Sequence, residues 1–166
     1  MIEVQVTEQM VQAAHLKAEE MGTLNNSISK GAGNVSGFIG EQVVMSVIGG
    51  TWSNTYEYDV VLDDGTKVDV KTKRTSVAPR DYYDCSVAAL NTTQKCDRYD
   101  FVRVANDLSV AWYLGWKGKG EYFDDARFLT KGEKDGDNGF VVKSDCYNLQ
   151  IKELNLLRYL LLLNIF

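Results

Sequence analysis

The sequence predicts a single α/β domain, because two segments with helical periodicity precede several short runs that are typical of strands. A chain of 166 residues fits one domain and can bury an adequate core. Its 45% hydrophobic and 11% aromatic content is that of a folded globule rather than a disordered segment. We find no internal repeat and no linker, and we therefore expect residues 1–166 to form one domain.

Two helices are expected in the first third of the chain. The first begins at about Thr7, a favourable N-cap, and ends near Met21, with Lys17 intruding on its apolar stripe. We expect it to be a packing helix. A loop rich in Gly, Asn and Ser covers residues 23–34 and leads to a second helix over residues 35–48, which Gly49 and Gly50 close.

The second helix carries a carboxylate in an apolar environment. A helical projection places Glu41 among mostly apolar side chains, and the opposite side of the helix is apolar as well. A buried carboxylate costs several kcal/mol unless a cation or a hydrogen-bond donor meets it. Gly37 and Gly40 would allow backbone or a ligand to approach closely. A plain ion pair with Lys71 and a metal site are both possible, and we favour the metal site.

Residues 57–73 predict a β-hairpin, because two β-branched and apolar runs flank a turn. A two-residue loop would mix apolar and charged side chains on each face. A three-residue loop over residues 63–65, with Gly65 in the left-handed conformation, separates them and places Asp59 opposite Asp69. One face is then apolar, with Tyr58, Val60, Leu62, Val68 and Val70. The other face is mainly charged, with Glu57, Asp59, Lys67, Asp69, Lys71 and Lys73.

The charged face of this hairpin has two interpretations. Asp59 and Asp69 as directly opposed like charges are destabilising, and two converging carboxylates suit a hard divalent cation. Lys71 follows two residues along the same face. In the alternative, the face is a solvated charge ladder in which Glu57 lies opposite Lys71 and the lysines neutralise the aspartates. The hairpin alone does not decide between the two.

The rest of the chain alternates predicted strands and helices. Strands are expected over residues 82–89, 100–105 and 109–116, the last two forming a second hairpin. Helices are expected in three places: a short one capped by Thr92 or Thr93, one over residues 121–129 and one over residues 151–163.

Cysteine and histidine usage excludes some classes of site. Cys85, Cys96 and Cys146 lack the spacing of zinc ligands, and the chain has a single histidine, His15. We expect reduced, mostly buried thiols and a surface position for His15. A hydrolytic triad centred on histidine is therefore excluded unless His15 serves in it.

Charge and targeting signals limit the partners. The net charge of −5 argues against a generic nucleic-acid coat protein, although residues 67–95 are rich in cations that could face phosphate. The sequence shows neither a signal peptide nor an apolar stretch long enough to span a bilayer. We expect a cytoplasmic protein with no membrane contact. The apolar run over residues 154–166 is too short to span and predicts a docking helix or a subunit interface.

The acidic and basic residues occur in an order that resembles a known family. Gly40-Glu41 on a helix, then Asp59, a hairpin and Asp69-Val70-Lys71 resemble the PD-(D/E)XK nuclease superfamily, which includes many restriction enzymes, junction resolvases and some homing endonucleases. The resemblance covers residues 31–74. The residue before the first aspartate is Tyr58 rather than proline. The resemblance implies a restriction-endonuclease-like core with a mixed central β-sheet flanked by helices.

The same resemblance implies a role for each matching residue. Asp59 and Asp69 would bind Mg²⁺ with the Val70 carbonyl, and Glu41 would be a further ligand, direct or through water. Mn²⁺ would be able to substitute. Lys71 would orient or activate the attacking water and stabilise charge on the phosphorane. Three further residues are candidates for substrate contact: Lys73, Arg74 and Gln94.

The expected function is therefore a Mg²⁺-dependent DNA endonuclease of restriction, homing or branched-DNA resolvase type. Phosphodiester hydrolysis needs a nucleophilic water and relief of developing negative charge, which metal ions supply. We expect DNA as the partner, no small-molecule cofactor, and a homodimer, because cutting two strands generally needs two sites. The alternative is a non-catalytic module for nucleic acid or protein that keeps the fold. A small structural metal-binding protein is a third possibility.

Overall fold

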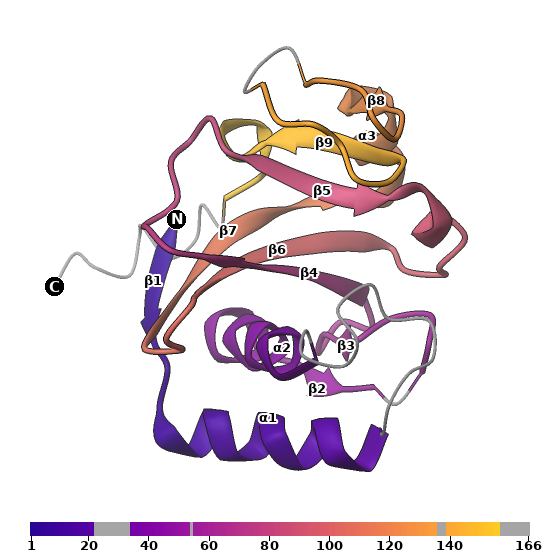
Figure 1. Cartoon of the computed structure of the whole chain (residues 1–166). Helices are drawn as coiled ribbons and strands as arrows, with labels where there is room; N and C mark the ends of the chain where they lie inside the picture. The colour runs from indigo at the N-terminus through magenta and orange to yellow at the C-terminus, as the bar shows by residue number, and fades with distance from the viewer. Residues whose placement is uncertain (22–33, 54, 136–138, 157–166) are drawn as a thin grey trace, which may run out of the picture.

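The computed structural model describes residues 1–21, 34–53, 55–135 and 139–156 (Figure 1). One sheet contains six strands: β1 (Ile2–Gln5), β2 (Thr51–Trp52), β3 (Val60–Val61), β4 (Lys67–Thr75), β6 (Arg98–Ala105) and β7 (Val110–Gly118). A second sheet contains three: β5 (Asp84–Ala88), β8 (Arg127–Leu129) and β9 (Cys146–Gln150). The α-helices are α1 (Glu8–Met21), α2 (Asn34–Ile48) and α3 (Lys119–Asp125), and two short 3₁₀ helices are η1 (Ala89–Asn91) and η2 (Ile151–Glu153).

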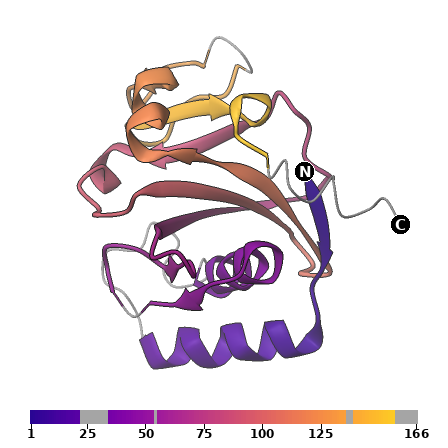
Figure 2. The ribbon, with the colours of Figure 1, turned by 180° about the vertical axis from the view of Figure 1, so that it is seen from behind.

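The larger sheet has the strand order β1-β7-β6-β4-β3-β2 and is mixed, because β4 and β6 are parallel while its other pairs are antiparallel. Helix α2 packs on one face of this curled sheet, and α1 covers the far side of α2 (Figures 1 and 2). The smaller sheet, in the order β5-β9-β8, lies over the other face together with α3. The predicted single α/β domain with a mixed sheet is confirmed.

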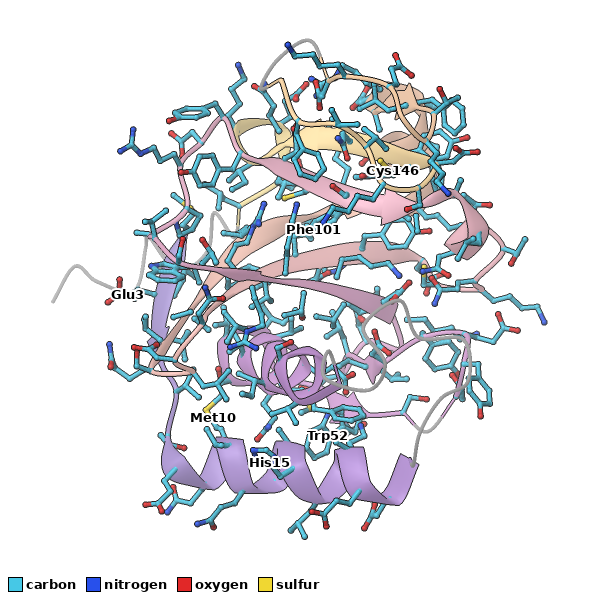
Figure 3. The ribbon with its side chains drawn as sticks, in the orientation of Figure 1. Glu3, Met10, His15, Trp52, Phe101 and Cys146 are labelled. Atoms are coloured by element: carbon cyan, nitrogen blue, oxygen red, sulfur yellow. The ribbon has the colours of Figure 1, made fainter. Side chains whose placement is uncertain are left out.

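Two apolar clusters hold these layers together. The first lies between α2 and the larger sheet, and its members include Phe38, Ile39, Val43, Val60, Val68, Val102 and Tyr113. The second lies between the two sheets, and its members include Cys85, Val87, Tyr99, Phe101, Tyr122 and Leu149. Each large side chain that is fully buried contributes about 1.5–3 kcal/mol through the hydrophobic effect. The side chain of Phe101 rises from β6 toward the smaller sheet (Figure 3).

The two N-terminal helices form where the sequence predicts them. The Met10 N–H donates to Thr7 Oγ1 at 3.2 Å, which caps α1 as expected. Helix α2 ends where Gly49 takes a φ of 83°, a left-handed conformation that glycine adopts without strain. The predicted loop over residues 23–34 falls almost wholly outside the described residues.

Helix α2 makes its closest approach to the larger sheet at Gly40. A Cβ atom added at this position would lie 1.9 Å from the hydroxyl oxygen of Thr72 on β4, whereas one added at Gly37 would meet nothing within 4 Å. Gly40 is thus needed for contact between helix and sheet, and it directly precedes Glu41. This contact sets the height of the Glu41 side chain above the sheet.

Gly40→Ala is expected to destabilise the protein by about 1–3 kcal/mol, because the extra methyl group overpacks this contact. Gly37→Ala is the matched control in the same helix, and it should be neutral or stabilising by up to about 1 kcal/mol. Urea denaturation of the two variants measures the difference. Adding Thr72→Ala to Gly40→Ala should recover most of the loss, and equal stabilities for the two single variants would contradict the close approach.

The second half of the chain departs from the predicted elements. The helix expected at Thr92 is replaced by η1, which ends at Asn91 and is followed by a turn. The helix expected over residues 121–129 ends at Asp125, because Ala126 is extended and the next three residues form β8. Only the start of the helix expected over residues 151–163 is helical, as η2, since Asn155 then bridges to β7. Residues 157–163 lie outside the described ranges.

Several side-chain predictions hold. The thiols of Cys85, Cys96 and Cys146 are free, and the first two are buried, as expected. Burial raises the pKa of the Cys96 thiol to about 11, so it stays protonated and unreactive at neutral pH. His15 is exposed on α1 (Figure 3). No helix in the described ranges is long and apolar enough to cross a membrane.

Candidate functional site

The hairpin formed by β3 and β4 has the predicted register and loop. Val60 lies opposite Val68 and Val61 opposite Lys67. Asp59 directly precedes β3, its N–H donates to the Val68 carbonyl at 2.9 Å, and its carboxylate is close enough to that of Asp69 to interact with it. The loop closes with Gly65 at a φ of 88°, the left-handed conformation that the three-residue loop requires. The bulged hairpin was therefore the correct choice over a two-residue loop, and it brings the two aspartates together.

The apolar face of the hairpin packs against α2 as predicted, with one exception. Val60, Leu62, Val68 and Val70 all join the cluster beneath α2. Tyr58 instead packs against the cluster between the two sheets. The reason is that β3 contains only two residues, so the alternation of the strand does not extend back to Tyr58.

Asp59 and Asp69 form the centre of the candidate site. Asp59 directly precedes β3, and its carboxylate accepts a hydrogen bond from the Val70 N–H of β4 at 2.7 Å. Asp69 is 2% exposed, and its Oδ2 atom accepts no well-angled hydrogen bond from the described residues. Burial raises the pKa of Asp59 well above its ordinary value, and the nearby carboxylates of Asp69 and Glu41 raise it further.

Lys71 lies beside this pair of aspartates. Its Nζ atom is 2.7 Å from Asp69 Oδ2 and donates a hydrogen bond to Gln94 Oε1 at 3.1 Å. The same amine lies 5.6 Å from the centre of the Tyr99 ring, on the strand next to β4. Lys71 is thus held by contacts on three sides. The structure thus places three of the candidate residues, Asp69, Lys71 and Gln94, in contact with one another.

Glu41 reaches the site from α2, and its partner differs from the one considered. Lys17 of α1 pairs with Glu41 Oε2 at 3.1 Å. The alternative in which Glu41 forms an ion pair with Lys71 was therefore wrong. The Lys17 amine also lies 4.1 Å from the Trp52 ring centre and 4.8 Å from that of Phe38. Burial raises the pKa of Glu41, and Lys17 and Trp52 offset part of this effect. Trp52 lies between α1 and the larger sheet (Figure 3).

The balance of charge at the site is negative. Three carboxylates, Glu41, Asp59 and Asp69, interact with one another, whereas two amines, Lys17 and Lys71, pair with them. The carboxylates are neutralised fully only when one of them binds a proton or a further cation joins the site. Burial is the main cause of the raised pKa values of Glu41 and Asp59, and the neighbouring carboxylates add to it.

The site offers oxygen donors without a finished metal cluster. In the described part of the chain, no group of three or more Asp, Glu, His or Cys side chains is arranged to hold a metal ion. The donors that are present are carboxylates, of which Asp69 Oδ2 pairs with the Lys71 amine at 2.7 Å, and carboxylates are nevertheless the ligands that a hard cation prefers. Binding a cation here would require Lys71 or Lys17 to shift from its carboxylate.

The remaining candidates separate into two groups. Lys73 follows Lys71 on the same face of β4 and lines the space between the two sheets. Arg74 does not join the site, because its guanidinium donates to the Asn106 carbonyl near the other end of β4.

The alternative of a solvated charge ladder was wrong in its pairing, since Glu57 pairs with Lys95 at 3.4 Å rather than with Lys71.

Lys17 is the member of the site that the sequence interpretation missed. The sequence does contain an indication of its role, because Lys17 interrupts the apolar stripe of α1. A charged residue on a packed face needs a buried partner, and Glu41 on the next helix supplies one. Trp52 and Tyr99 carried no such signal.

Neither a scan against protein-family models nor a search of the curated proteins finds a match to this chain.

Proposed function

We propose that the protein is a Mg²⁺-dependent DNA endonuclease with a restriction-endonuclease-like core. The observation that supports this most is the pair of buried carboxylates of Asp59 and Asp69, with the Lys71 amine 2.7 Å from Asp69 and with Glu41 close enough to interact with both electrostatically. Carboxylates and an amine side by side are the groups that phosphodiester hydrolysis requires. The order of these residues along the chain is the one on which the family resemblance rests.

The carboxylates are suited to the implied Mg²⁺. Asp59 and Asp69 would hold it, together with the Val70 carbonyl, and Glu41 would be a further ligand. The excess of negative charge among the buried carboxylates favours an added cation, which would displace the Lys71 amine from Asp69. A bound Mg²⁺ would supply Lewis acidity toward the phosphate and lower the pKa of an attacking water.

Lys71 and Gln94 would then act on the substrate and the water. The Lys71 amine is already directed at the site by Asp69 and Gln94, which leaves little conformational entropy to lose when phosphate binds. On release from Asp69 it would donate to a non-bridging phosphate oxygen, where negative charge develops. Gln94 would keep the amine in position through its carbonyl oxygen.

A second candidate function is a non-catalytic binding module that keeps this fold. The Lys17–Glu41 ion pair favours it, because Glu41 is already neutralised by a lysine. In such a module Asp69→Ala would leave binding of the partner intact, and Mg²⁺ would have no effect. The two functions are therefore distinguished by the response to the cation.

Incubation with supercoiled plasmid and Mg²⁺ tests the proposed function. The wild-type protein should convert the plasmid to nicked or linear DNA, and EDTA should abolish the conversion. Linear and four-way-junction substrates in the same assay distinguish restriction or homing activity from resolvase activity. Background nicking by the wild-type protein with Mg²⁺ and with Mn²⁺, on all of these substrates, would reject the proposal.

The endonuclease would act as a homodimer, each copy cutting one strand. The apolar residues on which this proposal rests are Leu156, Leu157, Leu160 to Leu163, Ile165 and Phe166. Leu156 is 51% exposed, and the others lie outside the described residues. A monomer by light scattering at micromolar concentration would reject the dimer without bearing on the chemistry.

A further inference from the structure

A cleft runs between the two sheets, starting at Lys71. It consists of two adjoining cavities of about 360 and 460 Å³, within the range of about 300–1,000 Å³ typical of ligand sites. The inner cavity is lined by Lys71, and the outer one opens beside β9. Both are lined by Lys73, Asp84, Ser86, Ala88 and Arg103. The cleft therefore connects the candidate site with the far edge of the smaller sheet.

Two cations that face this cleft lie side by side. Lys73 of β4 and Arg103 of β6 are register partners on the parallel strands. Lys73 has neither a hydrogen bond nor an ion pair among the described residues, and its pKa is lowered by burial and by Arg103. Arg103 is 7% exposed and donates to the Asp84 carbonyl at 2.6 Å. Two neighbouring cations in one cleft, in a protein with a net charge of −5, are suited to a bound anion.

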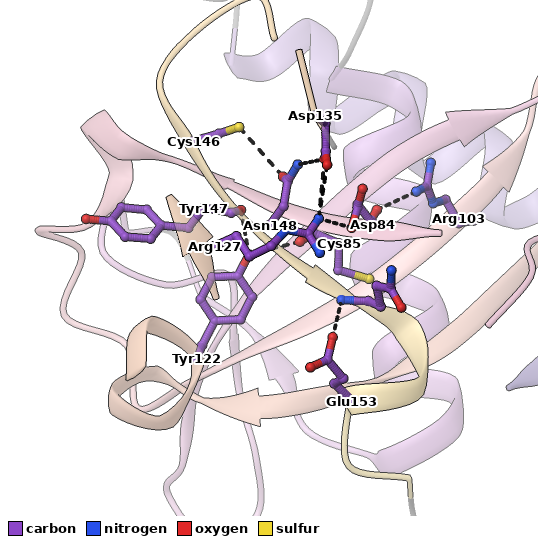
Figure 4. Close-up of polar contacts among 11 residues, drawn as sticks. Asp84, Cys85, Arg103, Tyr122, Arg127, Asp135, Cys146, Tyr147, Asn148 and Glu153 are labelled. Atoms are coloured by element: carbon purple, nitrogen blue, oxygen red, sulfur yellow. Dashed lines mark hydrogen bonds and ion pairs between the residues drawn. The ribbon is translucent and has the colours of Figure 1, made fainter. Parts of the chain in front are cut away.

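The one carboxylate at the centre of the cleft does not cancel this charge. Arg127 lies 3.1 Å from Asp84 Oδ1 and 3.3 Å from Asp135 Oδ2, and Asn148 donates to Asp135 at 3.2 Å (Figure 4). Because Arg127 is shared by Asp84 and Asp135, the network carries one net negative charge, and the two charges of Lys73 and Arg103 leave the cleft with one net positive charge. The network also connects β5, β8 and β9, and Arg103 of β6 is held against β5 by its hydrogen bond to the Asp84 carbonyl.

Aromatic side chains line the outer end of the cleft. Tyr82 and Phe140 are each 54% exposed and line the outer cavity, and Tyr83 lies edge-on to Tyr82 with ring centres 5.2 Å apart. Lys143 and Ser144 complete this end. Exposed rings beside cations are the arrangement that stacks bases and tracks the backbone of a single strand.

We propose that this cleft binds a single strand of DNA, with phosphates at Lys73 and Arg103 and bases against Tyr82 and Phe140. The exposed aromatic rings of the outer cavity favour a single strand over a duplex, because unpaired bases can stack on them. The proposal deepens the proposed function and rests on it for one point, that the strand continues to Lys71 for cleavage.

Fluorescence anisotropy in EDTA tests binding without hydrolysis. Labelled oligothymidine should bind more tightly than a fully paired hairpin of the same length. Lys73→Gln should weaken binding of the single strand about tenfold, because it removes one charge-assisted phosphate contact. Tyr82→Ala should weaken it by a similar factor through lost stacking. Lys152→Gln, which removes the same charge from exposed η2 outside the cleft, should leave binding within twofold of wild type.

The outcomes separate this inference from the proposed function. Tight binding of the single strand by the wild type, lost in Lys73→Gln, supports the cleft whether or not plasmid is cut. Tighter binding of the paired hairpin, or equal effects of Lys73→Gln and Lys152→Gln, overturns it even for an active nuclease. Circular dichroism of each variant confirms that the fold is retained, and Lys73 is exposed enough for substitution to be tolerated.

Discussion

Lys71→Met should lower the rate of Mg²⁺-dependent plasmid cleavage about a thousandfold. In the proposed function the Lys71 amine would neutralise charge on the phosphorane, and loss of a single such donor costs about 10²–10³ in rate. Loss of the ordering that Lys71 imposes on Asp69 and Gln94 adds to the effect. Single-turnover cleavage at saturating protein measures it, because the chemical step is then separated from binding.

Lys67→Met is the matched control for this substitution. Lys67 is on the same strand and exposed, with its amine 5.4 Å from the centre of the Tyr58 ring rather than at the carboxylates. It should keep cleavage within a few-fold of wild type. Cleavage by Lys71→Met within a few-fold of wild type would remove Lys71 from the chemistry and reject the assigned role.

Lys17→Met should destabilise the metal-free protein by about 2–3 kcal/mol at pH 8. Methionine can still pack against Phe38 and Trp52, but it loses the cation–π attraction of the amine and leaves the Glu41 carboxylate, whose side chain is 10% exposed, without its cation. Breaking a fully buried pair costs about 3–5 kcal/mol, and partial exposure of both side chains reduces the cost here. Urea denaturation in EDTA measures this loss.

The loss should shrink at low pH. Burial raises the folded-state pKa of Glu41 above its ordinary value of 4.5, and removing Lys17 raises it further. The folded state then binds more protons than the unfolded state, so the stability of the variant falls as pH rises from 4.5 through the folded pKa. Denaturation at pH 5 should therefore show a smaller loss than at pH 8. The double variant Lys17→Met/Glu41→Gln should recover most of it, and equal losses at both pH values would contradict this account.

The two N-terminal helices and the hairpin could be predicted because local patterns decide them, whereas the short strands β1 and β2 were missed. The cap at Thr7, the glycines that close α2 and the alternation around Gly65 each leave one favourable conformation. The register of the hairpin followed from one face being apolar, and the hairpin brings the carboxylates of Asp59 and Asp69 close enough to interact. The proximity of these two side chains could therefore be predicted from the sequence.

The second half was predicted less well because distant contacts decide it. Strand β9 exists as the partner of β5 and β8 as the partner of β9, and the paired residues of β5 and β9 are 58 to 66 positions apart. The three residues of β8 carry too little pattern to be distinguished from the end of α3. The ion pair between Lys17 and Glu41 likewise depends on how two helices stack, which local periodicity does not specify.

Titration of the metal-free protein with Mn²⁺ in a calorimeter tests most directly whether the acidic side chains share one cation. The wild-type protein should bind Mn²⁺ saturably, and Asp69→Asn and Asp59→Asn should each abolish binding. Binding should become tighter as pH rises, because the raised pKa of Asp59 makes its proton compete with the ion. No heat of binding to the wild type, or equal binding by wild type and Asp69→Asn, would contradict it.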